Sequence, residues 1–278
     1  MPGYVAPVLK TSADKPSAEV RRFRELAQPG GRRRHGQFVV EGLTLTRWAV
    51  DDRLPVRCLA HTAELSRSAD GAALLQLAAR EGIPDFRASS GLMGTLTPTR
   101  PLPAVIATVA LRLRDAAQLE TGPDAVLLVA EDLQNPDNLG MVLRTADAAG
   151  VEAVVVAGDA ADPLHRNCVR AARGAVGRIA IFTCADLPAW LADLRERGFQ
   201  VIGATAHAEV SMFESRLRPP IAIVVGNEDH GVSGAVLDVC TERVRIPMAP
   251  GQDSLNVGVA AGVLLYEAQR ARLSGHGR

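Results

Sequence analysis

The chain has 278 residues, of which 47% are hydrophobic and only 4% aromatic, so Ala, Val and Leu must fill its core. This content excludes a globally disordered chain. The 31 basic residues balance the 31 acidic ones, so net charge neither supports nor excludes a nucleic-acid partner. No apolar run is long enough to predict a membrane span, and the four cysteines stand singly, which predicts neither a zinc site nor a disulfide framework. We expect a cytoplasmic protein without metal or membrane partner.

The N-terminal stretch carries a local excess of positive charge, with nine Lys or Arg against four Asp or Glu in residues 1–50. Residues 1–18 contain several prolines and no apolar signal segment, so we expect a flexible lead there. A glycine- and proline-rich stretch at 29–36 predicts an exposed loop. It carries three arginines that are expected to contact phosphates, Arg32, Arg33 and Arg34.

A small α/β unit is predicted over residues 19–112. Helices are expected over 18–26, 44–50 and 72–81, and strands over 38–42, 56–60 and 104–111. A charged and polar stretch at 113–124 then predicts a linker to the rest of the chain.

Residues 125–278 have a more regular pattern. Apolar runs that predict buried strands lie at 125–130, 151–157, 178–183, 200–205, 221–226 and 243–247. Helical patterns occupy 138–149, 162–172, 186–196, 235–240 and 257–272. This alternation predicts a parallel sheet with helices on both faces. The chain has no dinucleotide-binding glycine motif after the strand at 125–130, no phosphate-binding P-loop and no nucleophile elbow, which disfavours three common chemistries of such sheets.

Three segments break the apolar pattern where predicted strands end, at 132–150, 221–233 and 244–262. Ligands of open α/β sheets bind at the carboxyl ends of strands. Taken alone, each segment also has an ordinary structural interpretation. Asn138 and Ser254 could be helix N-caps, Arg144 could be a surface arginine, and Glu228 could lie in a solvated turn. In the last helix, Gly258 and Gly262 indicate close packing against another element or a second subunit.

Together the three segments resemble the motif set of the SpoU/TrmH group of the SPOUT RNA methyltransferases. The first resembles N-x-x-N-x-G-x-x-x-R-T-A-x-A-x-G, from Asn135 to Gly150. The second, from Gly226 to Ser233, resembles a glycine followed by N-E and then G-[LIV]-S. The third resembles I-P-M, a short loop and S-L-N-V-x-x-A, from Ile246 to Ala260. The order and the strand–turn–helix contexts also agree.

This resemblance implies an α/β fold whose C-terminal parallel-sheet domain, residues 125–278, is threaded as a trefoil knot, a rare exception to unknotted topology. It implies S-adenosylmethionine as methyl donor, a ribose 2′-hydroxyl of RNA as acceptor, no metal and a homodimer. The implied donor-binding residues are Thr205, Gly226, Ile246, Met248 and Leu255. The implied catalytic residues are Asn138, Arg144, Glu228, Ser254 and Asn256.

Arg144 is the residue to which the resemblance assigns activation of the hydroxyl. An arginine is a poor base because its pKa lies above about 12, so stabilisation of the developing alkoxide by its charge is an equally open role. Asn138 and Glu228 are expected to orient Arg144 and the ribose.

The N-terminal unit, with Phe38-Val-Val-Glu-Gly42 after the arginine-rich stretch, resembles the small RNA-recognition domain of many family members, which is similar in fold to RNA-binding ribosomal proteins. The same two-domain layout occurs in ribosomal RNA enzymes, including thiostrepton-resistance methylases. Large-subunit ribosomal RNA is therefore the favoured substrate. Transfer RNA stays open as a substrate, as do an RNA-binding factor without methylation and a metabolic enzyme acting on a small molecule.

Overall fold

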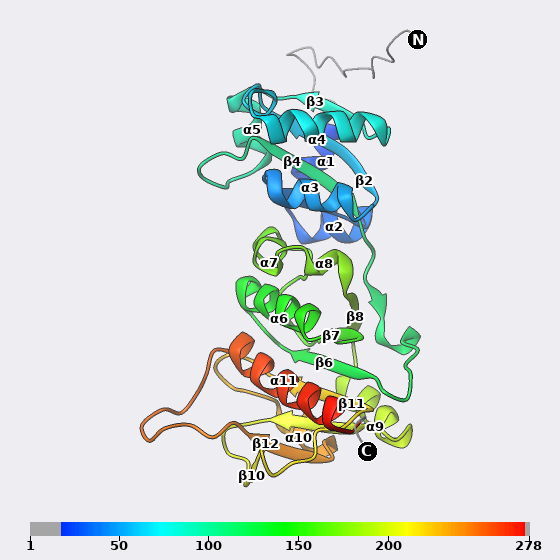
Figure 1. The fold of residues 1–278 in the computed structure, drawn as a ribbon, viewed down its shortest axis with the longest axis vertical. Coiled ribbons are helices and arrows are strands. Elements are labelled where there is room, and N and C mark those ends of the chain that lie inside the picture. Colours follow the sequence, from blue (N-terminus) through cyan, green and yellow to red (C-terminus); the bar gives the residue numbers. More distant parts are fainter. Residues whose placement is uncertain (1–17, 276–278) are drawn as a thin grey trace. The chain divides into compact units, whose positions relative to one another are not determined.

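The computed structural model of the chain describes residues 18–275, so nearly all of the expected lead at 1–18 lies outside the described residues (Figure 1). The chain divides into two compact units, Met1–Arg112 with Leu164–Arg170, and Leu113–Pro163 with Ala171–Arg278. Within the described part, no helix is both long and apolar enough to cross a membrane.

A four-stranded sheet of order β1-β4-β2-β3 forms the centre of the first unit (Figure 1). Its strands are β1 (Gln37–Glu41), β2 (Val56–His61), β3 (Asp85–Arg87) and β4 (Val105–Ala110). β4 runs antiparallel to β1 and β2, whereas β3 runs parallel to β2. The carboxyl ends of β1, β2 and β3 therefore lie at one edge of this sheet.

Helices cover the first sheet and close its core. They are α1 (Ala18–Leu26), α2 (Pro29–His35), α3 (Leu43–Asp51), the short 3-10 helix η1 (Leu65–Arg67), α4 (Ala69–Arg80) and α5 (Ser90–Leu96). In α1, Val20 and Phe23 are three residues apart and both are buried, because positions at this spacing share a helix face. Phe23 meets Phe86 of β3 edge to face, with ring centroids 6.1 Å apart.

The prediction of an exposed loop at 29–36 is wrong, because this stretch forms α2. Pro29 occupies the first turn, where its missing N–H costs nothing. Gly36 ends the helix in the left-handed conformation, with φ 57°. Gly31 has to be glycine, since a Cβ there would lie 1.9 Å from the carbonyl oxygen of Glu25. Contact with α1 thus overrides the low helix propensity of the glycines.

Glu41, at the end of β1, fastens the segment that leads into β4. Its carboxylate accepts hydrogen bonds from the hydroxyls of Thr97, at 2.6 Å, and Thr99, at 2.5 Å. Thr97 is almost completely buried. The glutamate of the Phe38–Gly42 segment therefore has a structural role inside the first unit.

An eight-stranded sheet of order β10-β12-β9-β11-β6-β7-β8-β5 forms the second unit, and all its paired strands are parallel. The strands are β5 (Arg114–Asp115), β6 (Val126–Glu131), β7 (Ala153–Ala157), β8 (Ala180–Cys184), β9 (Gln200–Ala204), β10 (Val210–Ser211), β11 (Ile221–Val225) and β12 (Glu242–Arg245). The predicted parallel sheet is confirmed.

Helices of the second unit flank this sheet. They are α6 (Pro136–Ala148), α8 (Ala175–Arg178), α9 (Leu187–Glu196), α10 (Gly234–Val239) and α11 (Val257–Gly275). The helix α7 (Arg166–Ala172) belongs for the most part to the first unit. α9 and α10 bury apolar side chains in one cluster with alternate residues of the central strands, such as Leu127 and Val129 of β6. α11 packs against α6 and β11.

The predicted linker at 113–124 is built into the edge of the second unit. Its residues form β5, which pairs with β8, and the 3-10 helix η2 (Ala116–Gln118). The Arg114 guanidinium lies 4.5 Å from the centroid of the Phe182 ring. The indole N–H of Trp190 donates to the Ala116 carbonyl at 3.2 Å.

We predict that Glu41→Ala lowers the free energy of unfolding of the first unit by about 1 to 3 kcal/mol, because the buried Thr97 hydroxyl loses its acceptor. Urea unfolding of the full chain, followed by a probe in the first unit, measures this change. Glu81→Ala is the matched control, since Glu81 is an exposed helix-end glutamate whose side chain makes no hydrogen bond or ion pair with the described residues. Equal stability of both variants would contradict the assigned role.

Candidate active site

The carboxyl ends of β9, β11 and β12, with Asn138 of α6, line a pocket of about 500 Å³ in the second unit. All five predicted donor-binding residues line it, and so do all predicted catalytic residues except Arg144. These lining residues are Asn138, Thr205, Gly226, Glu228, Ile246, Met248, Ser254, Leu255 and Asn256. The structure thus brings together three segments that are far apart in the chain.

The Glu228 carboxylate joins the second segment to the first. One of its oxygens accepts the backbone N–H of Gln134 at 3.0 Å. The other accepts the backbone N–H of Asn135 at 3.2 Å and the side-chain amide of Asn138 at 2.9 Å. Partial burial by itself would raise the pKa of Glu228, but these hydrogen bonds outweigh it and hold the pKa below its ordinary value. Glu228 is therefore a fixed anion at neutral pH.

Asn138 extends this connection to the third segment. Its side-chain oxygen accepts a hydrogen bond from the side-chain amide of Asn256 at 2.9 Å, and Asn256 in turn caps α11 by accepting the N–H of Gly258. The capping alternative for Asn138 and Ser254 does not hold: Asn135 caps α6 by accepting the N–H of Asp137, and Asn256 rather than Ser254 caps α11. Asn138 is free of the capping role and faces the pocket.

The turn after β11 folds tightly back on itself. Asn227 accepts the N–H groups of Asp229 and His230 on its side-chain oxygen and donates to the Asp132 carbonyl at 2.9 Å. A Cβ on Gly226 would lie 2.2 Å from the carbonyl carbon of Gly231. The backbone can pass here only because Gly226 has no side chain.

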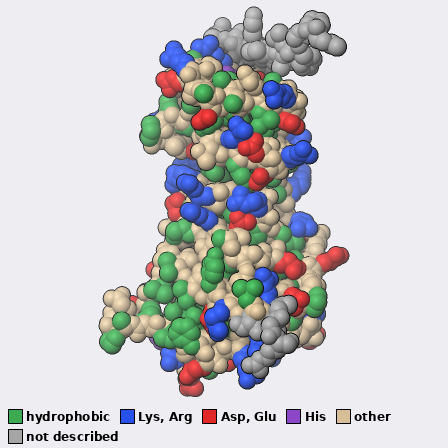
Figure 2. All heavy atoms as spheres, in the orientation of Figure 1, with side chains coloured by type: hydrophobic (Ala, Val, Ile, Leu, Met, Phe, Trp, Pro, Cys, Tyr) green, Lys and Arg blue, Asp and Glu red, His purple; other side chains and the backbone are tan. Residues whose placement is uncertain are grey.

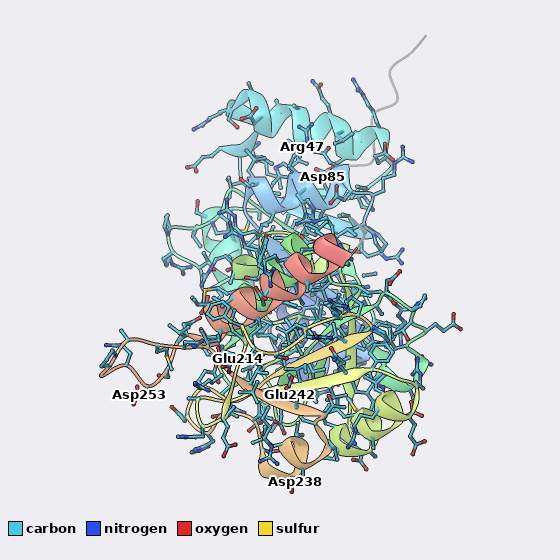
Figure 3. The ribbon with its side chains drawn as sticks, turned by 60° about the horizontal axis from the view of Figure 1, so that its bottom comes forward. Arg47, Asp85, Glu214, Asp238, Glu242 and Asp253 are labelled. Carbon is cyan, nitrogen blue, oxygen red and sulfur yellow. The ribbon has the colours of Figure 1, made fainter. Side chains whose placement is uncertain are left out.

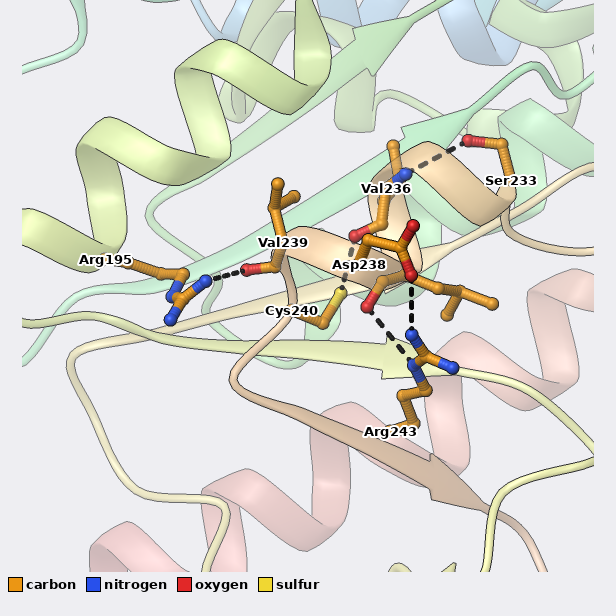
Figure 4. A network of polar contacts seen from close by, with 8 residues as sticks. Arg195, Ser233, Val236, Asp238, Val239, Cys240 and Arg243 are labelled. Atoms are coloured by element: carbon orange, nitrogen blue, oxygen red, sulfur yellow. Dashed lines mark hydrogen bonds and ion pairs between the residues drawn. The ribbon is translucent and has the colours of Figure 1, made fainter.

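Sequence reasoning missed Glu131, the buried last residue of β6. Its carboxylate accepts both the backbone N–H and the hydroxyl of Ser233, at 2.9 and 2.6 Å. Ser233 also caps α10 through the N–H of Val236 (Figure 4). The sequence did contain a signal, since Glu131 is a single carboxylate at the end of an apolar run. A buried acid needs hydrogen-bond donors, so this position indicated a polar contact.

The far end of α10 is fastened by polar contacts as well (Figure 4). Arg195 donates to the Val239 carbonyl, and Arg243 contacts the Leu237 carbonyl and the Asp238 carboxylate. Burial raises the pKa of the Cys240 thiol to about 11, so this cysteine is an unreactive packing residue. α10 is thereby held as a fixed support behind the turn of Gly226.

Four titratable residues of the pocket were not predicted as site residues: His207, Asp229, His230 and Asp253. Asp253 lies on the loop that projects from the second unit between β12 and α11 (Figure 3). The lining contains three carboxylates, those of Glu228, Asp229 and Asp253, and no Lys or Arg among the described residues. The pocket is therefore suited to a ligand with positive charge.

Arg144, the residue expected to act on the hydroxyl, does not line the pocket of its own chain. It is exposed on α6, and its guanidinium makes no hydrogen bond or ion pair with any residue in 18–275. The neighbouring face of α6 is occupied by α11, where Cβ atoms on Gly258 and Gly262 would lie 3.0 Å from Met141 and 3.1 Å from Thr145. The glycines thus serve the packing of α11 on α6.

In the first unit, the prediction that Arg32 contacts phosphates is wrong. Arg32 is only 3% exposed, and its guanidinium donates to the carbonyls of Leu26 and Ala27 at 3.0 and 3.2 Å. It caps the end of α1 instead. Arg33 and Arg34 are exposed on α2, as a phosphate-binding role requires.

Comparison with known proteins agrees with this geometry. A model of the SpoU rRNA Methylase family matches residues 125–266. The chain is 31% identical, over 90% of both chains, to an uncharacterized tRNA/rRNA methyltransferase of Synechocystis sp.. It is 38% identical to the 23S rRNA (guanosine-2′-O-)-methyltransferase RlmB of Ralstonia nicotianae, over 59% of this chain and 66% of that enzyme. The SpoU methyltransferase AviRb of Streptomyces viridochromogenes, solved in complex with AdoMet, superposes with a TM-score of 0.80 at 29% identity, over 93% of this chain and 100% of that chain. The chain therefore belongs to the SpoU rRNA methylase family.

Proposed function

We propose that this protein transfers the methyl group of S-adenosylmethionine to a ribose 2′-hydroxyl of large-subunit ribosomal RNA, and that it works in the cytoplasm as a homodimer. The observation that carries the proposal is the hydrogen-bonded chain from Glu228 through Asn138 to Asn256, which joins the three family motifs around one pocket. The names of the RlmB relatives support the ribosomal substrate. An acceptor in transfer RNA is the alternative.

The residues of the pocket fit a methyl donor. Its volume of about 500 Å³ lies within the range of sites for small molecules and cofactors. S-adenosylmethionine supplies an electrophilic methyl group on a cationic sulfonium, and the three carboxylates of the lining favour that charge. We assign its binding to Thr205, Gly226, Ile246, Met248 and Leu255. The bare backbone at Gly226 lets the turn close on one side of the pocket.

The chain's own contribution to the reaction is placement and charge. A ribose hydroxyl is a weak nucleophile at neutral pH, so it needs a base or a nearby positive charge. Asn138 and Glu228, fixed by their mutual hydrogen bond, orient the ribose, and Ser254 and Asn256 border the same space. Arg144 is proposed to act on the hydroxyl, either by stabilising its developing negative charge or by accepting its proton.

We infer that the homodimer forms across α6 and α11. Large apolar side chains are exposed there at spacings that share one face of α11: Val259, Tyr266 and Leu273 are 52, 54 and 69% exposed. Met141 of α6, 38% exposed, continues this apolar surface, and Figure 2 shows hydrophobic side chains gathered over these helices. Contiguous apolar surface of this kind marks an interaction site.

Arg144 lies one turn from Met141 on α6 and is therefore beside the proposed dimer surface. In a symmetric dimer the same surface meets its own copy, so each exposed Arg144 is brought toward the partner. We propose that it completes the partner's pocket, which lacks a cation of its own. We also infer the trefoil knot at the C-terminal end of the chain, supported by the insertion of β9 between β11 and β12 in the sheet.

Gly226→Ala is predicted to reduce the affinity for S-adenosylmethionine at least about tenfold, because the added methyl group collides with the backbone of Gly231 and forces the turn to open. Isothermal titration calorimetry measures the affinity. Gly234→Ala is the control: a Cβ on Gly234 meets nothing within 4 Å, so this variant should bind the donor like the wild type. Unchanged affinity in a folded Gly226→Ala protein would mean that the donor site is misplaced.

Arg144→Ala is expected to slow single-turnover methyl transfer by at least about a hundredfold at saturating RNA, with the donor affinity retained. Arg144→Lys distinguishes the two roles. Partial activity of the lysine variant indicates stabilisation by charge, whereas activity as low as that of the alanine variant indicates a need for the guanidinium itself. A wild-type rate for Arg144→Ala would remove the catalytic assignment.

Subunit mixing tests whether Arg144 acts across the dimer. Leu255→Lys places a positive charge in the pocket at a 42% exposed position, so this variant should fold and fail to bind the cationic donor, which it repels. Mixing it with Arg144→Ala should restore about a quarter of the wild-type activity, since half of randomly formed dimers then contain one intact composite site. No restoration in a mixture shown to contain heterodimers would place Arg144 and the donor in the same chain.

A further inference from the structure

We propose that the first unit holds a site for RNA phosphates at the carboxyl edge of its sheet, separate from Arg33 and Arg34. The site is a hollow lined by Thr62, Glu64, Arg67, Arg87, Ser89 and Ser90, together with two alanines. The inference rests on the proposed function for the identity of its ligand as RNA, and it goes beyond that function by locating a second contact.

The topology of the sheet creates this hollow. β2 and β3 are parallel neighbours whose last residues, His61 and Arg87, stand in register. The N–H of Ala88 donates to the His61 carbonyl at 2.8 Å, which holds the two segments together where they leave the sheet. The segment after β2 continues into η1 and the segment after β3 continues into α5, and the hollow lies between these two segments.

The hollow has two arginines whose guanidinium groups are available. Arg67 and Arg87 are exposed, and neither guanidinium makes a hydrogen bond or an ion pair with any residue of the described part. Other arginines of this unit are engaged: Arg47 pairs with Asp51, and Arg100 donates to backbone carbonyls. A guanidinium presents two parallel donors that match the oxygens of a phosphate.

The remaining charges near the hollow leave it positive. His61 contacts the Asp85 carboxylate at 2.9 Å, so that carboxylate already has a partner. Glu64 is the single carboxylate of the lining, against two arginines. With two arginines against one glutamate, the lining has a net positive charge, which favours a bound anion.

Thr62 supplies an independent indication of a ligand. It is only 8% exposed, and its hydroxyl has no hydrogen-bond partner among the described residues. An unsatisfied buried hydroxyl costs about 1 to 3 kcal/mol.

The site lies at the opposite edge of the sheet from Arg33 and Arg34. Those two residues belong to α2, which leads directly into the amino end of β1, and β1 is oriented like β2 and β3. A six-residue strand spans roughly 20 Å, so the two basic sites are separated by about the length of β2. An RNA that contacts both sites lies across the first unit rather than on one tip.

The test is binding of an unmethylated 23S rRNA transcript to the full chain, measured by filter binding over a range of salt concentrations. Combined Arg67→Ala and Arg87→Ala should weaken binding about tenfold at low salt and lower the slope of log affinity against log salt by about 1.5, for two lost phosphate contacts. Glu64→Gln should strengthen binding. Arg80→Ala, which removes one positive charge at the far end of α4, should change affinity less than about twofold.

A pair of threonines separates ligand binding from structure. Thr62 and Thr46 both have buried hydroxyls without a partner in the described part, but only Thr62 lines the hollow. Replacing either by Val should leave stability equal or higher, since an unsatisfied hydroxyl is removed. Only Thr62→Val should weaken RNA binding, by a few fold. Equal effects of the two variants on RNA affinity would count against the role of Thr62.

Equal RNA affinity and salt slope for the wild type and the double arginine variant would overturn the site, and so would absence of RNA binding by the wild type. Inorganic phosphate could stabilise the wild type but not the double variant while the two proteins bind RNA equally well. That result would assign the hollow to a small phosphate ester and would also overturn the RNA site. Absence of methyl transfer, with the expected differences in binding, would count against the proposed function alone.

Discussion

The active site depends on the carboxylate of Glu228, which is held at the N-terminal end of α6. The first backbone N–H groups around a helix start have no partner within the helix, and that end carries partial positive charge. With its two oxygens, Glu228 accepts the N–H of the N-cap Asn135, the N–H of the preceding Gln134 and the Asn138 amide. Since Asn138 is also bonded to Asn256, one carboxylate fixes three segments that approach the pocket from different strands.

The pocket could be predicted from the sequence because the strands of the sheet are parallel. Strands of a parallel sheet that is covered on both faces are continuous apolar runs, and the runs at 125–130 and 221–226 became β6 and β11 within a residue. Polar residues that follow such runs have to collect at one edge of the sheet. Their grouping follows from strand direction, whereas the individual bonds depend on one-residue details, as the shift of the α6 cap from Asn138 to Asn135 shows.

The first unit was less predictable because its local structure depends on contacts between segments. Glycine and proline at 29–36 have low helix propensity, and no local pattern reveals that the Gly31 backbone touches the Glu25 carbonyl. The same contact places Arg32 against the end of α1, where carbonyls without helix partners accept its guanidinium. Of the three neighbouring arginines, one therefore has a structural role and two are exposed. The order of charged residues in the sequence does not distinguish them.

The distribution of charge separates donor binding from catalysis. Carboxylates around the pocket favour a cationic donor, but a positive residue beside them would weaken that binding through like-charge repulsion with the sulfonium. An alkoxide forming next to the same pocket needs positive charge at the moment of reaction. The chain keeps Arg144 outside its own pocket, on an exposed face of α6, which avoids this conflict. In the homodimer that we propose, the partner subunit would supply the charge, so that donor binding and catalytic competence would depend on different surfaces of the same fold.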